Sequence, residues 1–199
     1  MLTIWDLNDA MAFHFYSPGL ATALGNLLPK SAPVLDLGCG KGTYLAHLDK
    51  EGYHCLGVEG TSGIAAIADF PRIVEADLSR PLEIEWPRGS VLCLEVAEHL
   101  APESEPQLLE TIDRYCDTWL VFSWAIVGQG EHGHNNCRPN TYVYDQMIMR
   151  GFEFLPRETF VLRDAADYET GWLKSTLFVF RRCVAVTIPA GLPLSSPQI

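Results

Sequence analysis

The sequence predicts an α/β fold in which a doubly wound, mostly parallel sheet is covered by helices on both faces. From residue 33 onward, short continuously apolar runs of strand length alternate with segments of helical periodicity. Continuous apolar strands are typical of sheets buried on both faces, and strand–helix alternation is typical of parallel sheets. The length of 199 residues fits one domain.

The elements are predicted in chain order. Residues 9–28 are helix-prone, and the break at Ser17-Pro18-Gly19 divides them into two short helices. Strands are then expected at residues 33–37, 53–59, 72–76, 90–94 and 118–125. Helices are expected at residues 43–50, 62–69 (with Ser62 as cap), from about 104 to 116, and 140–150.

The end of the chain predicts a change of strand direction. Two further strands are expected at residues 160–163 and 175–181 with no helix between them, which indicates an antiparallel edge. Residues 184–199 contain three prolines and two serines and are expected to form an irregular tail. We therefore expect one domain over residues 1–183, with residues 1–30 as an N-terminal helical cap.

The composition excludes several classes of protein. Apolar residues make up 48%, too many for a disordered chain. The net charge of −11 disfavours DNA as a partner, because phosphates attract clustered Lys and Arg. No apolar run reaches the ~18 residues of a membrane span, and Met1 to Asp9 carries no basic residue of a signal peptide. Six cysteines without a CxxC pair predict a reducing, cytoplasmic location.

A glycine-rich turn, Asp36-Leu37-Gly38-Cys39-Gly40-Lys41-Gly42-Thr43, follows the first strand. Alternate glycines let the backbone turn tightly and approach a ligand at the start of a helix. A P-loop would need Ser or Thr after Lys41, where the chain has Gly42. A dinucleotide fingerprint would need glycine at Thr43, so an NAD-type oxidoreductase is the poorer alternative.

The spacing of Asp36, Gly38, Gly40 and Gly42 resembles the first motif of class I S-adenosylmethionine-dependent methyltransferases, and the resemblance extends over residues 31–182. It implies a Rossmann-like, seven-stranded sheet in the order 3-2-1-4-5-7-6 with strand 7 antiparallel. It also implies S-adenosylmethionine as cofactor. The expected cofactor-binding residues are Asp36, Gly38, Cys39, Gly40, Glu59, Gly60, Asp77, Leu78 and Glu95.

Two acids at strand ends have assigned roles in this interpretation. Glu59 ends the second strand and is placed to accept hydrogen bonds from vicinal ribose hydroxyls; alternatively it is a solvated strand-end charge. The resemblance implies that Asp77 accepts from the adenine amino group and that the amide of Leu78 meets a ring nitrogen. A turn cap is the alternative for Asp77.

After the fourth strand, Glu95-Val96-Ala97-Glu98-His99 resembles the ExxEH string of metal-assisted O-methyltransferases, including ubiquinone-type and small-RNA 2′-O enzymes. In these enzymes ExxEH and a later histidine can ligate a divalent ion. If this protein is metal-dependent, the resemblance implies Glu95, Glu98, His99 and His134 as ligands, a set that suits Mg²⁺, Mn²⁺ or Zn²⁺. The alternatives are an acid pair at a helix start, with a satisfied His99, and no metal.

The segment from Gly128 to Asn140 is rich in glycine and histidine. It resembles the GQGGxGHxNxxPxxY signature of bacterial and phage methyltransferases linked to glycan or small-molecule modification, through Gly133-His134-Asn135, Arg138-Pro139 and Tyr142. Glu131 stands where glycine is usual, and Val143 where tryptophan is usual. We predict His134 as a general base at the acceptor, with Glu98 and His99 framing the same pocket; ordering of the loop is the alternative role for His134. His132 is expected to be an exposed neighbour.

The predicted function is methyl transfer from S-adenosylmethionine to a small-molecule or glycan acceptor, with a hydroxyl as the expected target. An NAD-type oxidoreductase and a non-catalytic adenosylmethionine-binding module are the alternatives. DNA methylation is set aside because the sequence contains neither a [DNS]PP[YF] box nor a Pro-Cys dipeptide.

Overall fold

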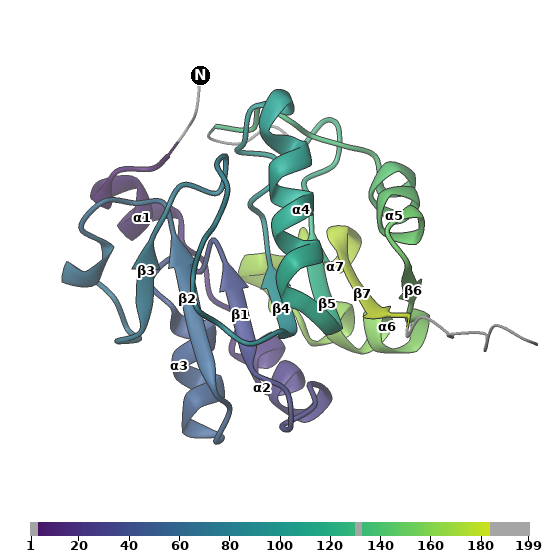
Figure 1. Cartoon of the computed structure of the whole chain (residues 1–199), viewed down its shortest axis with the longest axis horizontal. Helices are drawn as coiled ribbons and strands as arrows, with labels where there is room; N and C mark the ends of the chain where they lie inside the picture. Colours follow the sequence, from purple (N-terminus) through teal and green to yellow (C-terminus); the bar gives the residue numbers. More distant parts are fainter. Residues whose placement is uncertain (1–3, 130–132, 184–199) are drawn as a thin grey trace, which may run out of the picture.

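A computed structural model describes residues 4–129 and 133–183 of the chain. A single sheet runs through these residues, with seven strands in the order β3-β2-β1-β4-β5-β7-β6 (Figure 1). The strands are β1 (Val34–Leu37), β2 (Cys55–Glu59), β3 (Ile73–Glu75), β4 (Gly89–Cys93), β5 (Cys116–Ser123), β6 (Phe152–Phe154) and β7 (Leu177–Arg182). The predicted strand order is confirmed.

Strand directions also follow the prediction. β1 pairs in parallel with β2 and β4, and the parallel pairing continues to β3 on one side and β5 on the other. β7 is antiparallel to both of its neighbours, β5 and β6. The carboxyl ends of β1 to β5 therefore meet at one edge of the sheet, where open α/β sheets bind ligands.

Helices cover the sheet on both faces (Figure 1). The helices are α1 (Leu7–Phe13), α2 (Pro18–Leu27), α3 (Thr43–Lys50), α4 (Glu105–Tyr115), α5 (Asn140–Met149), α6 (Pro156–Ala165) and α7 (Leu173–Thr176), with 3₁₀ turns η1 (Ile64–Ala66), η2 (Pro102–Ser104) and η3 (Tyr168–Thr170). The predicted break before α2 is confirmed, and the hydroxyl of Ser17 caps α2 by accepting from the amide of Leu20 at 3.2 Å. Among the residues that the structure describes, no helix has the length and apolar character that crossing a bilayer requires.

Successive side chains of each strand enter different layers of the core, because they point to opposite faces of the sheet. In β1, Leu35 and Leu37 belong to the cluster that includes α4 and α5, whereas Val34 belongs to the cluster that includes α2, α3 and α6. All four residues of β1 are buried. This burial on both faces is the reason that three of the four residues of β1 are apolar, with Asp36 as the exception.

The strand predicted at residues 160–163 is wrong, because these residues lie within α6. Thr159 and Leu162 are buried at helical spacing, while Phe160 is 70% exposed. A four-residue apolar run fits a strand or one turn of a helix equally well. The strand at this edge is β6. The helices α6 and α7 lie between β6 and β7, so the prediction that no helix separates the two final strands is wrong.

The helix predicted at residues 62–69 is also wrong. Only η1 forms there, and it starts after Gly63, whose φ of +75° is left-handed. A left-handed residue directly after Ser62 prevents Ser62 from starting an α-helix. The last strand starts at Leu177 rather than at Ser175, because α7 extends to Thr176. The tail predicted for residues 184–199 lies outside the described residues.

Candidate active site

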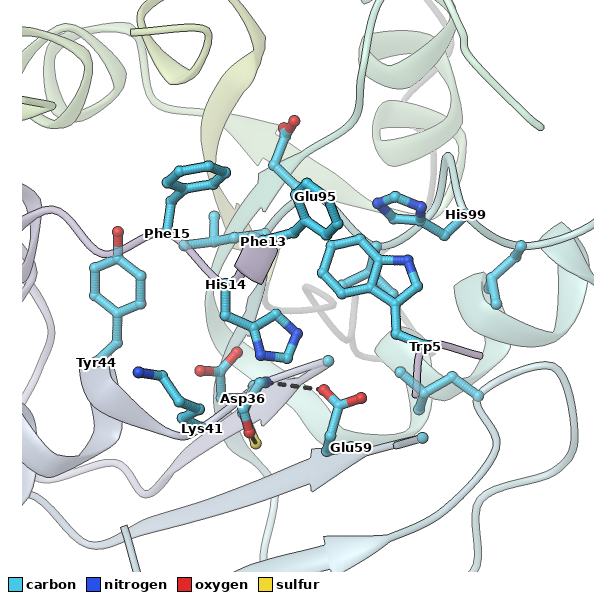
Figure 2. Close-up of a pocket in the computed structure, with 18 of the residues that line it drawn as sticks. Trp5, Phe13, His14, Phe15, Asp36, Lys41, Tyr44, Glu59, Glu95 and His99 are labelled. Atoms are coloured by element: carbon cyan, nitrogen blue, oxygen red, sulfur yellow. Dashed lines mark hydrogen bonds between the residues drawn. The ribbon is translucent and has the colours of Figure 1, made fainter. Parts of the chain in front are cut away.

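A cavity of about 380 Å³ lies at the edge of the sheet where β1, β2 and β4 end. One side is formed by the turns that follow these strands, and the other by the N-terminal segment from Ile4 to Phe15 (Figure 2). All of the predicted cofactor-binding residues line the cavity: Asp36, Gly38, Cys39, Gly40, Glu59, Gly60, Asp77, Leu78 and Glu95. The structure therefore brings the whole predicted set to one place.

The glycine turn between β1 and α3 has left-handed backbones at Gly38, Gly40 and Gly42, of which the first two line the cavity. Gly38 has a φ of +76° and Gly40 a φ of +55°, values that side-chain-bearing residues rarely adopt. A Cβ atom on Gly38 would lie 2.3 Å from the side chain of Val96, and one on Gly40 would lie 2.7 Å from the ring of His14. The backbone of this turn lines the cavity, and glycine lets the rest of the site pack closely against it.

Glu59 fastens the turn to the end of β2. Its Oε2 accepts a hydrogen bond from the amide of Gly40 at 2.8 Å, and its Oε1 accepts from the amide and the hydroxyl of Thr61, both at 2.9 Å. Its side chain lines the cavity, but the residue is only 8% exposed. The alternative of a solvated strand-end charge is therefore wrong.

Asp77 follows β3 and makes the turn-cap contact that was set as the alternative to a cofactor contact. Its Oδ1 accepts from the amide of Ser79 at 2.9 Å, as in a turn cap, and its Oδ2 lies 3.4 Å from Nε of Arg80. It also lines the cavity, together with Gly60 and the buried Leu78. Capping the turn thus holds the carboxylate at the cavity wall.

The electrostatics of the cavity favour a cationic ligand. The carboxylates of Asp36, Glu59, Asp77 and Glu95 line it, whereas Lys41 is the sole lysine or arginine among its described lining residues. Burial, and secondarily the nearby Glu59 carboxylate, raise the pKa of Asp36 to about 8. Ionisation of Asp36 is costly while the site holds no positive charge, and a cation would relieve that cost.

Glu95 is held in an unusual conformation at the end of β4. Its φ of 53° makes it the one described non-glycine residue with a left-handed backbone. Its amide donates to Oγ of Ser123 at 2.8 Å, and its carboxylate accepts from Thr176 at 3.2 Å and from Gln129 at 3.1 Å. Strained residues persist where their surroundings fix them, and they cluster at functional sites.

Glu98, His99 and His134 come together beside Glu95. One potential ligand atom from each of the three residues lies within 4.8 Å of the others. Glu98 is fully buried, and neither of its carboxylate oxygens has a hydrogen-bond partner among the described residues. Burial, and then the neighbouring Glu95, raise the pKa of Glu98 well above its ordinary value. An acid pair at a helix start is wrong as an explanation, because α4 begins only at Glu105.

This cluster fits a divalent ion in part. A buried carboxylate beside two imidazoles is a donor set that suits Mn²⁺ or Zn²⁺, and the buried Glu98 oxygens have the unused acceptor capacity that a ligand needs. Glu95, the fourth residue of the set that the resemblance implies, is outside the group. Its two oxygens instead accept the hydrogen bonds from Thr176 and Gln129.

The loop that carries His134 is docked onto the turn that carries Glu98. The carbonyl oxygen of Glu98 accepts from the amides of Asn135 at 2.7 Å and Asn136 at 2.9 Å. This places the rings of His134 and His99 4.9 Å apart, with both residues lining the cavity. Nδ1 of His134 lies 2.8 Å from the carbonyl oxygen of Gln129, a contact that assigns the proton to Nδ1 and leaves the Nε2 lone pair available. His132 and Glu131 lie outside the described residues.

Two groups of residues at this site have no counterpart in the predicted set. Rings from the N-terminal segment and Trp172 line the cavity, although no motif in the sequence marks them. The buried carboxylate of Glu105 accepts hydrogen bonds from Asn136, Arg138 and Tyr142. Arg138 and Tyr142 belong to the signature of the segment that carries His134. Their need for an acidic partner is the signal that could have led to Glu105.

Comparison with known proteins assigns the family. The sequence matches a family described as "Methyltransferase domain" over residues 9–152. No curated protein is similar enough in sequence to give a match.

Solved structures share the fold at low sequence identity. A TehB-like SAM-dependent methyltransferase from Corynebacterium glutamicum ATCC 13032 is 21% identical, with a TM-score of 0.59 over 89% of this chain and 93% of that chain. Magnesium protoporphyrin IX methyltransferase (ChlM) from Synechocystis PCC 6803, with bound SAH, is 15% identical, with a TM-score of 0.60 over 82% of this chain and 80% of that chain. The glycopeptide N-methyltransferase MtfA, complexed with sinefungin, is 14% identical, with a TM-score of 0.55 over 84% of this chain and 94% of that chain. Because the family match spans well over half of the chain and the sheet has the strand order expected of class I enzymes, this protein belongs to the S-adenosylmethionine-dependent methyltransferases.

Proposed function

We propose that this enzyme methylates a hydroxyl group of a small-molecule or glycan acceptor, with His134 as the general base. The observation that carries the proposal is that His99 and His134 line the same cavity as the complete predicted cofactor set, next to Glu95. The fold does not decide the acceptor, since the similar structures include enzymes named for magnesium protoporphyrin IX and for a glycopeptide nitrogen.

The cofactor is assigned to the turn-lined side of the cavity. Glu59 would accept from the ribose hydroxyls, Asp77 and the amide of Leu78 would meet the adenine, and Glu95 would lie at the methionine end. Support comes from the placement of these residues at the ends of β2, β3 and β4, around the bare backbone of Gly38 and Gly40. The surrounding carboxylates favour the positive sulfonium.

S-Adenosylmethionine supplies a methyl group on a good leaving group: the acceptor oxygen bonds to the methyl carbon while the carbon–sulfur bond breaks and its electron pair stays on sulfur. Nε2 of His134 takes the proton of the acceptor hydroxyl, and the imidazolium then loses it to water. The hydrogen bond from Nδ1 to Gln129 holds the ring in the tautomer that this transfer requires. Positioning by the cavity walls supplies most of the remaining acceleration.

A second version places a divalent ion at the acceptor end. Glu98, His99 and His134 would hold it, and it would lower the pKa of a bound hydroxyl. The buried, unpartnered carboxylate oxygens of Glu98 favour this version. We propose the metal-free base as the first version, and chelation separates the two.

The acceptor class and location are also proposals. The net charge of −11 supports an acceptor other than DNA. All six cysteines carry free thiols, which supports a reducing, cytoplasmic location.

The function is tested by calorimetry with S-adenosylmethionine, followed by a radiolabel transfer assay against phenols, sugars and amines. We expect cofactor binding and label transfer to a hydroxyl compound. Transfer only to amines would overturn the assignment to oxygen. Tight cofactor binding without transfer to any compound would instead favour a binding module.

A further inference from the structure

The side of the cavity opposite Asp36 and Glu59 is lined by aromatic rings. We call Trp5, Phe13, Phe15 and Trp172 the aromatic wall; all four line the cavity. Trp5 and Phe13 lie edge to face with ring centroids 5.9 Å apart, and Phe15 and Trp172 do so at 5.4 Å. Figure 2 shows Trp5, Phe13 and Phe15 in one row, across the cavity from Asp36 and Glu59.

The aromatic wall leads directly to the histidine pair. The ring of Trp5 lies 5.0 Å from that of His99, and His99 lies 4.9 Å from His134. A flat molecule lying against the wall would therefore reach the imidazoles with its edge. Phe13 and Phe15 keep 39% and 50% of their surface exposed. Clustered exposed apolar surface of this kind marks a binding site.

The charges around the wall exclude an anionic acceptor. Lys41 is the one lysine or arginine among the described residues that line the cavity. It lies on the glycine turn, with its Nζ 3.8 Å from Asp69. Phosphate and carboxylate groups are bound by cationic side chains, often bidentately by arginine. An acceptor that carries a phosphate would instead face the carboxylates of the cavity.

The wall suits a planar aromatic acceptor, because aromatic rings pack well on one another, and the size of the cavity limits the acceptor further. Small-molecule sites typically measure about 300–1,000 Å³. The cavity of about 380 Å³ is at the low end of this range and must take the cofactor as well.

We infer that the acceptor is an uncharged phenol of one or two rings, held against the aromatic wall with its hydroxyl beside His99 and His134. The inference rests on the proposed function and narrows its acceptor class. The phenolic oxygen forms the bond to the methyl carbon, the carbon–sulfur bond breaks with its electron pair on sulfur, and the phenolic proton goes to His134. The products are an aryl methyl ether and S-adenosylhomocysteine.

The inference is tested first by binding, which needs no turnover. 2-Naphthol is titrated into the protein saturated with S-adenosylhomocysteine, and tryptophan fluorescence is recorded. We expect saturable quenching for the wild type and affinity at least about tenfold weaker for Trp5→Leu and Phe15→Leu. Trp86→Leu is the matched control, because Trp86 packs on His54 and does not line the cavity. This variant should bind naphthol as the wild type does. Absence of naphthol binding to the loaded wild type would overturn the inference.

Turnover supplies the second measurement. We expect label transfer to 2-naphthol or catechol, with the KM of Trp5→Leu and Phe15→Leu raised at least about tenfold and their affinity for S-adenosylhomocysteine within about twofold of the wild type. Transfer to monosaccharides or nucleotides but not to phenols would overturn the inference and leave the proposed function standing. Failure of the protein to bind S-adenosylmethionine would contradict the proposed function itself. This failure is distinguishable from failure of the inference, because cofactor binding is measured separately from naphthol binding.

Discussion

The carboxylate of Glu59 accepts a hydrogen bond from the backbone amide of Gly40, 2.8 Å away and 19 residues earlier in the chain. Its other oxygen accepts from the amide and hydroxyl of Thr61. One side chain at the end of β2 thus holds the glycine turn in shape and also lines the cavity. Its removal should therefore affect the cofactor site through the turn as well as directly.

We expect Glu59→Ala to weaken S-adenosylmethionine binding by about 10- to 100-fold in calorimetry. Loss of this acceptor would leave the ribose hydroxyls of the bound cofactor unpaired, at a cost of about 1–3 kcal/mol, and would also release the amide of Gly40. Glu75→Ala is the matched control, because Glu75 pairs with Glu59 in the β2–β3 register and its side chain accepts from Gly63 without lining the cavity. An equal loss of affinity in both variants would contradict a specific role for Glu59.

We expect Gly40→Ala to abolish most cofactor binding, whereas Gly52→Ala should leave it intact. Both glycines have left-handed backbones, so each alanine adds strain of about 1 kcal/mol. Only at Gly40 would the new Cβ meet another group, the ring of His14 at 2.7 Å, whereas nothing lies within 4 Å at Gly52. Thermal unfolding should show a loss in both variants and calorimetry a loss in Gly40→Ala alone; wild-type affinity in Gly40→Ala would refute the assignment of the turn.

The raised pKa of Asp36 predicts a pH-dependent stability. Its pKa rises from an ordinary 3.8 to about 8 on folding, so between these values the folded protein holds a proton that the unfolded chain has lost. Stability of the ligand-free protein therefore falls as the pH rises through this window, by up to about 1.4 kcal/mol per pH unit from this residue. Urea unfolding at several pH values should show that Asp36→Asn reduces this fall, while the exposed Asp145→Asn does not. If the unfolding free energies of Asp36→Asn and the wild type fall equally with pH, the raised pKa of Asp36 is contradicted.

The central strands could be predicted from the sequence because burial on both faces leaves a local sign. All five residues of β4 are buried, and most of them are apolar. The edge strand β6 has only three residues and no such sign, and Phe160 with Val161 formed a more apolar run although both are exposed on α6. The order of the strands depends on contacts between distant segments, which periodicity does not carry, so only the family resemblance could supply it.

The candidate site also contains residues that could be predicted from the sequence and residues that could not. The glycine turn could be predicted because a left-handed backbone requires glycine, which is visible in the sequence. Glu59 could be predicted because it is an acid directly at the end of a predicted strand. Trp5 reaches the site because the segment from Ile4 to Phe15 lies along the cavity, where the ring of Trp5 meets that of His99. No local pattern separates such a tryptophan from one in the core. Glu105 could not be predicted for the same reason, because its role depends on contacts with residues far away in the chain.

The proposed metal-free base predicts that EDTA leaves turnover unchanged. His134→Ala should lower kcat by about 10²- to 10⁴-fold, the usual contribution of a general base, with cofactor affinity retained. His54→Ala is the control, because His54 is exposed and lies outside the cavity lining. Loss of turnover in EDTA and recovery with Mg²⁺ or Mn²⁺ would instead assign Glu98, His99 and His134 as ligands. Unchanged turnover in His134→Ala would defeat both versions.

Glu105 is predicted to position His134 without touching the cavity. Its carboxylate accepts from the side chains of Asn136, Arg138 and Tyr142, so it fixes the segment that follows His134. The residue is 5% exposed, and its ion pair with Arg138 is 2.8 Å long.

Glu105→Ala leaves these three donors without their acceptor, so we expect a loss of unfolding free energy of about 2–3 kcal/mol. In folded protein below its transition, kcat should fall about tenfold or more while cofactor affinity stays within about twofold, because Glu105 does not line the cavity. Glu103→Ala, two residues earlier and exposed, should change neither quantity. Glu105→Gln keeps the shape and one acceptor oxygen, so it should recover part of kcat. A destabilised Glu105→Ala that retains wild-type kcat would show that Glu105 supports the fold alone and that His134 is held by Gln129 and the Glu98 carbonyl.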